Sequence, residues 1–259
     1  MKTCIECKRK SCIKHIRGYC VHCYNRLRKN KILFSIKKNI PNKLTHKQIQ
    51  IINGLLLGDG HIERRKLTQN SILKVERSIK DESYLLDNFK ELENICPSKP
   101  KYRKKNNIVK FVNFYTRSLN LLNSFHDEWY LDKIKILPQN IYAHLTPLTC
   151  AIWFCDDGFV YRNRNTLGIK LCTHSFSESE NECLCKSLNQ ILKSNFIVSK
   201  IKHKNKYYFI LCGANETTIK FINYIKNNIP ISMNRKLSVF LDKLKEKCNG
   251  DEKLFEELA

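Results

Sequence analysis

The stretch INGLLLGDG at residues 52–60 has a counterpart in CAIWFCDDG at residues 150–158. Each is a short apolar run that ends in an aspartate and a glycine, and aligned end to end they place Asp59 opposite Asp157. The apolar spacing predicts a buried helix in each case, with a carboxylate delivered by its last turn. Two such carboxylates in a strongly basic chain favour metal-dependent chemistry on a nucleic acid.

Local signals set the ends of both predicted helices. Thr45, with Gln48 three residues later, predicts a capping box at the start of the first. Thr146, followed by a proline, predicts the start of the second. Gly54 and Gly58 lie four apart on one face of the first helix, although glycine lowers helix propensity. Close backbone contact with the second helix would explain them; the alternative is two tolerated glycines in a core helix.

The charge balance of the chain points to a polyanionic partner. Its 259 residues, room for two domains or one larger one, include 47 lysines and arginines against 24 acidic residues, a net charge of +23. Nucleic acid is the leading partner and an anionic membrane surface the rival. No apolar run approaches the ~18–20 residues of a membrane span, so we expect no membrane partner.

The N-terminus lacks the apolar core of a signal peptide. We therefore expect the protein to work inside the cell in a reducing compartment, and an organelle whose genome encodes it is one such compartment. The 13 cysteines fit that setting if the clustered ones bind metal and the scattered ones are core thiols.

Four of the N-terminal cysteines form two C-x-x-C pairs separated by twelve residues, Cys4 with Cys7 and Cys20 with Cys23. Pairs on two tight turns can supply four thiolates to a tetrahedral structural Zn²⁺. The alternative is a disordered basic tail with incidental thiols. A segment this short cannot bury its own core, so we expect it to be unfolded without metal. The possible substitute ligands are Cys12, His15 and His22.

A basic run follows the cysteine pairs, comprising Arg26, Arg28, Lys29 and Lys31. It suits an arm that touches phosphates, or else a solvated linker.

The two halves of the chain repeat one order of elements: helix, strand, strand, helix, strand, strand, helix. This predicts an α+β fold of two similar subdomains packed across a pseudo-twofold axis. After the first motif we expect strands at 61–67 and 71–78, a helix at 81–95, a hairpin at 101–105 and 108–116, and a helix at 118–129. After the second we expect strands at 159–164 and 167–174, a helix at 177–192, a hairpin at 197–202 and 207–212, and helices at 215–228 and 235–247.

The expected domain organisation has five parts. They are a four-cysteine zinc-binding segment at 1–30, a basic linker at 31–43, a first repeat at 44–140, a second repeat at 141–250 and an acidic tail at 251–259.

The paired runs and the element order resemble the double LAGLIDADG motif of homing endonucleases. The run from Ala151 to Gly158 is similar to a variant found in single-chain members encoded by introns, and the resemblance covers about residues 44–247. Ile152 stands where the motif has a packing glycine, while Ala151 and Cys155 keep a small pair four apart. The resemblance implies that the motif helices form the subdomain interface, that the antiparallel sheets form a DNA-binding saddle, and that the protein is a monomer.

The resemblance also implies an activity and its residues. A long asymmetric double-stranded DNA site would be cut once on each strand, with Asp59 and Asp157 binding two or three Mg²⁺ ions beside the scissile phosphates. Asp156 lies about 100° round the helix from Asp157, so we do not expect it to be the main ligand. Lys135 in the sequence KILP and Lys236 in NRKL match the basic residues that the family places near each active site. The alternative is that both are ordinary surface lysines.

Charged positions that alternate along the expected strands could contact DNA from one face of each sheet. Many would touch only phosphates and contribute affinity rather than specificity, and the alternative is a merely solvated face. The candidates are Arg64, Arg65, Lys74, Arg77, Arg103, Lys105, Arg162, Arg164, Lys170, Lys200, Lys202 and Lys204.

Four other functions compete with the endonuclease. An RNA maturase acting on an intron, or a DNA-binding protein that does not cleave, could use the same scaffold. The presence of both Asp59 and Asp157 favours the enzyme, although a maturase can keep them. A zinc-dependent transcription factor would explain the cysteines and the charge, but would leave the paired acids without a role. An intein is disfavoured because no splicing residues flank the domain.

Overall fold

The computed structural model describes residues 2–8, 10–11, 15–16, 19–29 and 41–247. The chain divides into two compact units, Met1–Pro41 and Asn42–Ala259. The first contains two small antiparallel hairpins, β1 (Lys2–Thr3) with β2 (Lys10–Ser11) and β3 (His15–Ile16) with β4 (Tyr19–Cys20), followed by α1 (Val21–Lys29). Cys12, Lys31, most of the expected linker and the expected acidic tail lie outside the described residues.

The first repeat of the second unit is built on a four-stranded antiparallel sheet in the order β5-β6-β8-β7. The motif helix α2 leads into two strands, a helix, a hairpin and a final short helix. Their bounds are α2 (His46–Leu57), β5 (His61–Glu63), β6 (Ile72–Ser78), α3 (Glu82–Leu92), β7 (Lys101–Lys105), β8 (Ile108–Tyr115) and α4 (Asn123–Trp129).

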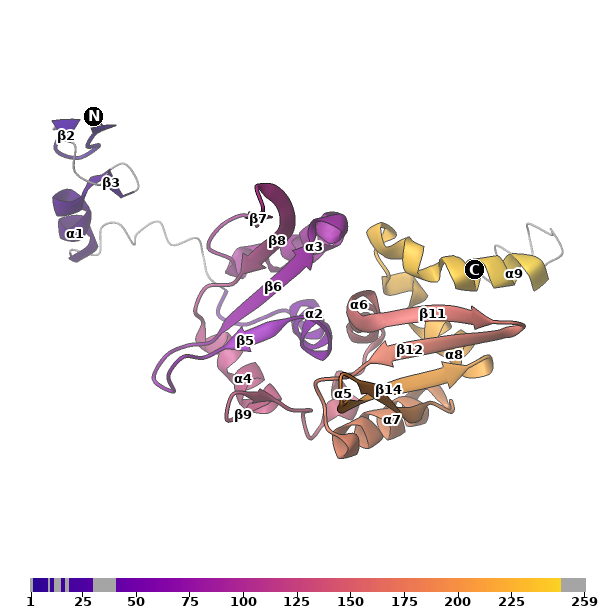
Figure 1. Ribbon diagram of the computed structural model, residues 1–259. Coiled ribbons are helices and arrows are strands. Elements are labelled where there is room, and N and C mark those ends of the chain that lie inside the picture. Colours follow the sequence, from indigo (N-terminus) through magenta and orange to yellow (C-terminus); the bar gives the residue numbers. More distant parts are fainter. Residues whose placement is uncertain (1, 9, 12–14, 17–18, 30–40, 248–259) are drawn as a thin grey trace. The chain divides into compact units, whose positions relative to one another are not determined.

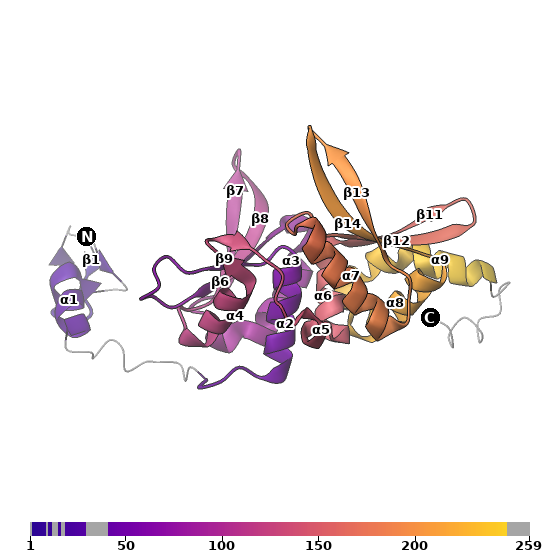
Figure 2. The same ribbon diagram turned by 90° about the horizontal axis from the view of Figure 1, so that it is seen from below.

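The second repeat has the same topology, with its sheet in the order β11-β12-β14-β13. Its elements are α6 (Pro147–Asp157), β11 (Gly158–Asn163), β12 (Thr166–Cys172), α7 (Glu178–Leu192), β13 (Ile197–His203), β14 (Lys206–Ala214), α8 (Glu216–Ile225) and α9 (Ser238–Lys247). The predicted α+β fold of two αββαββα repeats is confirmed. In Figure 1, α2 and α6 run side by side between the two sheets. In Figure 2, the hairpins β7–β8 and β13–β14 project from the same side of the molecule.

The predicted helix starts are also confirmed. The Thr45 hydroxyl accepts a hydrogen bond from the Gln48 backbone N–H at 3.2 Å, and the Gln48 side chain accepts one from the Thr45 N–H at 3.1 Å. Thr146 caps α6 by accepting from the Thr149 N–H at 3.2 Å. Satisfying these first donors fixes where each motif helix begins, and therefore where its last turn places the acid.

The two motif helices pack through a complementary contact of small and large side chains. A Cβ added to Gly54 would lie 2.7 Å from the Ile152 Cβ, and one added to Gly58 would lie 2.4 Å from the Asp156 Oδ2. The glycines thus make the predicted close contact with the second motif. The partners on α6 are Ile152 and Asp156, however, and not the small pair that includes Cys155. The side chain of Cys155 packs in a separate core cluster.

The connection between the repeats contains two elements that the sequence did not predict. One is a hairpin of β9 (Tyr130–Leu131) and β10 (Ile134–Lys135), and the other is the short helix α5 (Ile141–His144). The hairpin turn consists of Asp132 and Lys133, whose φ angles are 48° and 68°. Two consecutive positive φ angles are typical of a two-residue hairpin turn, for which Asp-Lys is a weak sequence signal. This hairpin places Lys135 near α2.

Candidate active site

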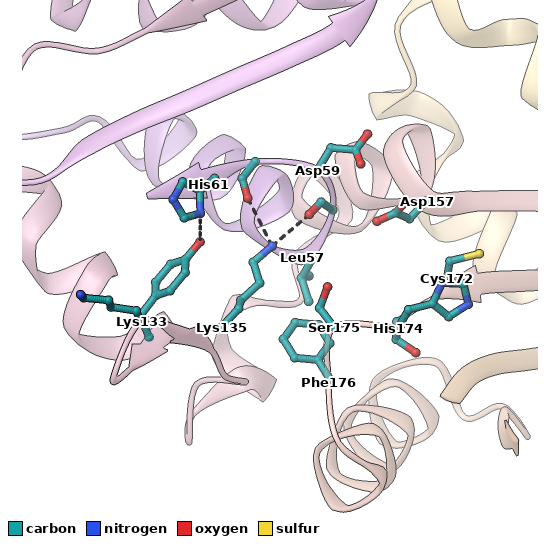
Figure 3. Close-up of a pocket in the computed structure, with 14 residues that line it drawn as sticks. Leu57, Asp59, His61, Lys133, Lys135, Asp157, Cys172, His174, Ser175 and Phe176 are labelled. Atoms are coloured by element: carbon teal, nitrogen blue, oxygen red, sulfur yellow. Dashed lines mark hydrogen bonds between the residues drawn. The ribbon is translucent and has the colours of Figure 1, made fainter. Parts of the chain in front are cut away.

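The motif helices end side by side and bring two acids to one hollow. Asp59 follows the last turn of α2, and Asp157 is the last residue of α6. Both line a cavity of about 430 Å³, which Lys135, Cys172 and His174 also line. Figure 3 shows Asp59, Asp157 and Lys135 entering it from different elements. A second hollow of similar volume is lined by Asp156, Asp157 and Lys236 among others.

Each motif helix has a lysine bound to the carbonyls at its C-terminal end. The Lys135 ammonium donates to the Gly58 carbonyl at 3.0 Å and to the Gly60 carbonyl at 3.2 Å. The Lys236 ammonium donates to the carbonyls of Phe154, Asp156 and Gly158 at 3.1, 3.2 and 2.9 Å. A cation is favourable at this end of a helix, where unpaired carbonyls and the dipole are negative. An ammonium has three protons, so Lys135 keeps one for another acceptor while Lys236 has none to spare.

The crowding of charges changes the ionisation of the site. Burial, together with the neighbouring carboxylates of Asp59 and Asp156, raises the pKa of Asp157 to about 7. Burial lowers the pKa of Lys135 to about 8 and lowers the pKa of Lys236. Carboxylates that repel one another in a half-buried hollow gain from a cation placed between them, so the site is electrostatically suited to bind a divalent ion.

Asp156 does not line the hollow that Asp59, Asp157 and Lys135 share, and its carboxylate is bound on several sides. Its side chain is 0% exposed and forms an ion pair with Arg77 at 2.6 Å. It also accepts hydrogen bonds from the Tyr84 hydroxyl at 3.0 Å and from the Asp59 backbone N–H at 3.2 Å. The second Arg77 amine lies 3.1 Å from Asp59 Oδ2. Asp156 is therefore held in a buried structural ion pair, as expected of a residue that is not the main metal ligand.

Arg77 differs from the other cations predicted to contact DNA. Its side chain is only 5% exposed and points to the helix-covered face of β6, so the expectation of a surface DNA contact is wrong for this residue. The strand offered a signal for this, because Leu73, Val75 and Arg77 share one face and the first two are buried. Tyr84, the other partner of Asp156, was missed because its position in α3 reads as ordinary core.

In the first repeat, most of the other cations of the predicted set are paired with acids. Arg65 and Lys74 both contact Glu63. Arg103 contacts Glu76 at 2.6 Å, and Arg64 forms an ion pair with Asp127. Lys105 ends β7 and is exposed. These acids reduce the net positive potential of the first sheet.

In the second repeat, most cations of the predicted set lie against aromatic rings or in turns. The Lys170 ammonium lies 5.1 Å from the centre of the Tyr161 ring, and Lys200 and Lys202 lie 4.8 and 5.9 Å from that of Tyr207. Arg164 and Lys204 occupy turns with positive φ. Arg162 is the exception, because it forms an ion pair with Glu246 of α9. Strands β11 to β14 contain no acidic residue.

The N-terminal unit gathers the four predicted cysteines. The sulfurs of Cys4, Cys7, Cys20 and Cys23 all lie within 4.8 Å of one another. Cys7 and Cys20 are 4.0 Å apart, far longer than the ~2 Å of a disulfide. Four sulfurs at tetrahedral zinc with ~2.3 Å bonds lie about 3.8 Å apart, so this spacing fits one ion. The Cys20 backbone N–H donates to the Cys4 sulfur at 3.3 Å, a contact that favours the thiolate.

The fold and the site together define a class of protein: two like repeats, each of which supplies one acid and one lysine at the junction of its motif helix with a basic antiparallel sheet. The sequence pattern of the LAGLIDADG DNA endonuclease family matches residues 49–219, and the chain belongs to that family. None of the helices in the described ranges is long and apolar enough to cross a membrane.

Several known proteins are similar to this chain. The cytochrome b mRNA maturase bI2 of Saccharomyces cerevisiae is 28% identical over 204 residues, which cover 71% of this chain and 47% of that protein. The maturase of the same name from Debaryomyces hansenii is 30% identical over 173 residues, covering 64% and 63%. DNA endonuclease I-ChuI of Chlamydomonas applanata is 25% identical over 170 residues, covering 61% and 78%. The alignment thus spans less than two-thirds of either maturase.

A solved structure supports the same fold. The homing endonuclease I-WcaI, described bound to its DNA recognition sequence, superposes with a TM-score of 0.69 at 22% identity. The superposition covers 79% of this chain and 92% of that chain.

Proposed function

We propose that this protein is a site-specific endonuclease that hydrolyses one phosphodiester on each strand of a long, asymmetric double-stranded DNA target. The observation that carries the proposal is the paired site: Asp59 and Asp157 come from equivalent helix ends, and each end has its own lysine. A site with one acid per repeat suits a duplex, whose two strands present two scissile phosphates.

Asp59 and Asp157 are the residues that would hold divalent ions, and Mg²⁺ is the ion that we propose, in two or three copies. Their carboxylates supply the oxygen ligands that Mg²⁺ prefers, and the Asp59 side chain is 51% exposed and so open to an ion and its waters. A bound ion would supply Lewis-acid stabilisation of the phosphorane and leaving oxygen. The carboxylates themselves orient the site and remain charged once a cation offsets their mutual repulsion.

Lys135 is the better placed of the two lysines to act on substrate. Two of its protons are bound to carbonyls and the third remains for a phosphate oxygen or a water in the shared cavity. A positive charge fixed beside the scissile phosphate would stabilise the charge that develops in the transition state. Lys236, bound to three carbonyls, would act mainly through its charge and by fixing the end of α6.

The sheets supply the DNA-binding surface in this proposal. Exposed cations on β7, β13 and the turns would contact phosphates, and the two hairpins that project on one side suit a duplex groove. Arg77 is excluded from this set. The N-terminal cysteines would bind one structural Zn²⁺ and fold the first unit.

RNA maturation is the second candidate, and the likeness to two cytochrome b mRNA maturases favours it. A maturase on this scaffold would bind intron RNA, and its function would not depend on the two aspartates. Strand cutting that depends on Asp59 and Asp157 therefore separates the two functions.

The test is to incubate the protein with Mg²⁺ and a large randomised duplex library and to sequence the broken ends. The proposal predicts a recurrent long site cut once on each strand. Asp59→Asn and Asp157→Asn should each abolish cutting of one strand and leave DNA affinity within about threefold, because binding rests on the sheets. Asp242→Asn, an exposed change on α9, is the matched control. Binding without cuts, together with tight binding to intron RNA, would favour the maturase.

A further inference from the structure

The pseudo-twofold relationship between the repeats is broken at two positions in the site. Gly58 precedes one acid, whereas Asp156 precedes the other. In the sheets, Lys74 pairs with His61 and Lys170 pairs with Phe159, two residues after each acid, so these lysines correspond. Three residues beyond them, Arg77 in the first repeat corresponds to Thr173 in the second.

The two residues that break the symmetry bind each other. Asp156 of the second motif helix and Arg77 of the first sheet form an ion pair at 2.6 Å, with side chains 0% and 5% exposed. The absence of a side chain at Gly58 makes room for the Asp156 carboxylate. One charged pair therefore crosses the repeat interface in one direction only.

This pair reaches Asp59 by two routes. The other Arg77 amine lies 3.1 Å from Asp59 Oδ2, and Asp156 accepts a hydrogen bond from the Asp59 backbone N–H. A planar guanidinium can bind two carboxylates at once in a fixed geometry, which a lysine ammonium on its flexible stem cannot reproduce. The charged neighbours that shift the pKa of Asp157 are the carboxylates of Asp59 and Asp156 and then the ammonium groups of Lys135 and Lys236, and no arginine is among them. The two acids thus have different surroundings.

We propose that Arg77 is a positioning residue for the Asp59 half of the site, and that Asp156 of the opposite repeat fixes it in place. The two strands are then cut by unequal centres, and only the cut that depends on Asp59 requires the Arg77–Asp156 pair. This inference rests on the proposed endonuclease function and adds to it that the two repeats contribute unequal catalytic centres.

The first test measures the nicking rate of each strand separately on a target labelled at both ends. Asp59→Asn first identifies the strand that depends on Asp59. Arg77→Lys and Asp156→Asn should then slow that strand by roughly tenfold to a hundredfold, the scale of a catalytic group displaced by about 1 Å. In Arg77→Lys the other strand should change by less than about threefold, a small effect compared with that of a displaced catalytic group. Asp156→Asn also removes a charge that acts on Asp157, so its effect is read on the Asp59 strand alone.

Ile222→Val, a buried change on α8, is the control for a general loss of stability and should slow both strands alike. Equal slowing of both strands by Arg77→Lys, or no change in either, would overturn the inference. Wild-type protein that cuts neither strand would instead count against the proposed function.

A second measurement tests the inference without any activity. Carbon-13 NMR of the aspartate side chains, with signals assigned from the two Asp→Asn variants, reports each carboxyl separately. Arg77→Lys should shift the Asp59 signal and leave that of Asp157 in place, even in protein that does not cut DNA. An unmoved Asp59 signal in a folded variant would show that Arg77 does not position it.

Discussion

Lys135 and Lys236 stand in the same relationship to their motif helices, because each ammonium donates to backbone carbonyls that flank an active-site acid. They reach this position by different means. Lys135 arrives on the β9–β10 hairpin, and Lys236 lies in a 3₁₀ segment, Ile231–Leu237, just before α9. The equivalence is therefore one of bonding and not of local structure.

Replacing either lysine by methionine should reduce DNA cutting and also destabilise the fold. The helix-end carbonyls would lose their donors, at a cost of about 1–3 kcal/mol for a buried unsatisfied group. Lys236→Met should cost more than Lys135→Met, because it leaves three acceptors and not two. Urea unfolding measures the difference. Lys47→Met, which removes an exposed ion pair with Glu91, is the control and should cost about 0.5 kcal/mol or less.

Gly58→Ala should destabilise the interface between the repeats. The added methyl would overlap the buried Asp156 carboxylate, and such overpacking typically costs about 1–3 kcal/mol. Thermal unfolding measures this effect. Gly213→Ala is the comparison away from the site. Its added methyl would also meet a neighbour, the Thr217 side chain, but within the second repeat and not at the interface between the repeats. If Gly58→Ala were neutral, the helices would pack less closely than described.

Salt dependence should distinguish DNA-facing lysines from the rest. Lys200→Gln and Lys202→Gln, on the projecting β13–β14 hairpin, should each reduce the slope of log K against log salt concentration by about one. Lys186→Gln, exposed on α7, should leave the slope unchanged. Fluorescence anisotropy at several salt concentrations gives the slopes. Equal effects of all three changes would mean that the hairpin has no special role.

The N-terminal unit should bind one Zn²⁺ per chain. Metal analysis of reduced protein should find about one equivalent, falling below about a tenth after Cys23→Ser or strong chelation, since all four thiolates are needed for a closed site. The exposed Cys183→Ser change should retain the metal. Stoichiometry far below one in the wild-type chain would contradict the assignment of zinc.

Local signals explain why much of this site could be predicted from sequence. The caps at Thr45 and Thr146 fix where the motif helices start, so Asp59 and Asp157 follow from counting turns. The repeated order of elements then predicts the two sheets. Expected strand 61–67 was too long, because β5 ends at Glu63 and the Arg64 side chain, not a strand partner, donates to the backbone carbonyls of Leu67 and Gln69 in the segment that follows.

What could not be predicted depends on contacts between distant parts of the chain. Arg77 reads as one more strand cation until Asp156, from the other repeat, is placed beside it. The β9–β10 hairpin was missed because Asp132 and Lys133 are a poor turn pair, and the turn is held by the bonds that Lys135 makes to α2. In each case a tertiary contact outweighs the local preference.

Because Gly54 and Gly58 pack against Ile152 and Asp156, the two repeats have complementary interface surfaces and are not interchangeable. Two second repeats brought together would set isoleucine against isoleucine and one buried carboxylate against another. Two first repeats would face each other across an empty seam. Each repeat is thus shaped to pack against the other, unlike repeat of the same chain and not against a copy of itself.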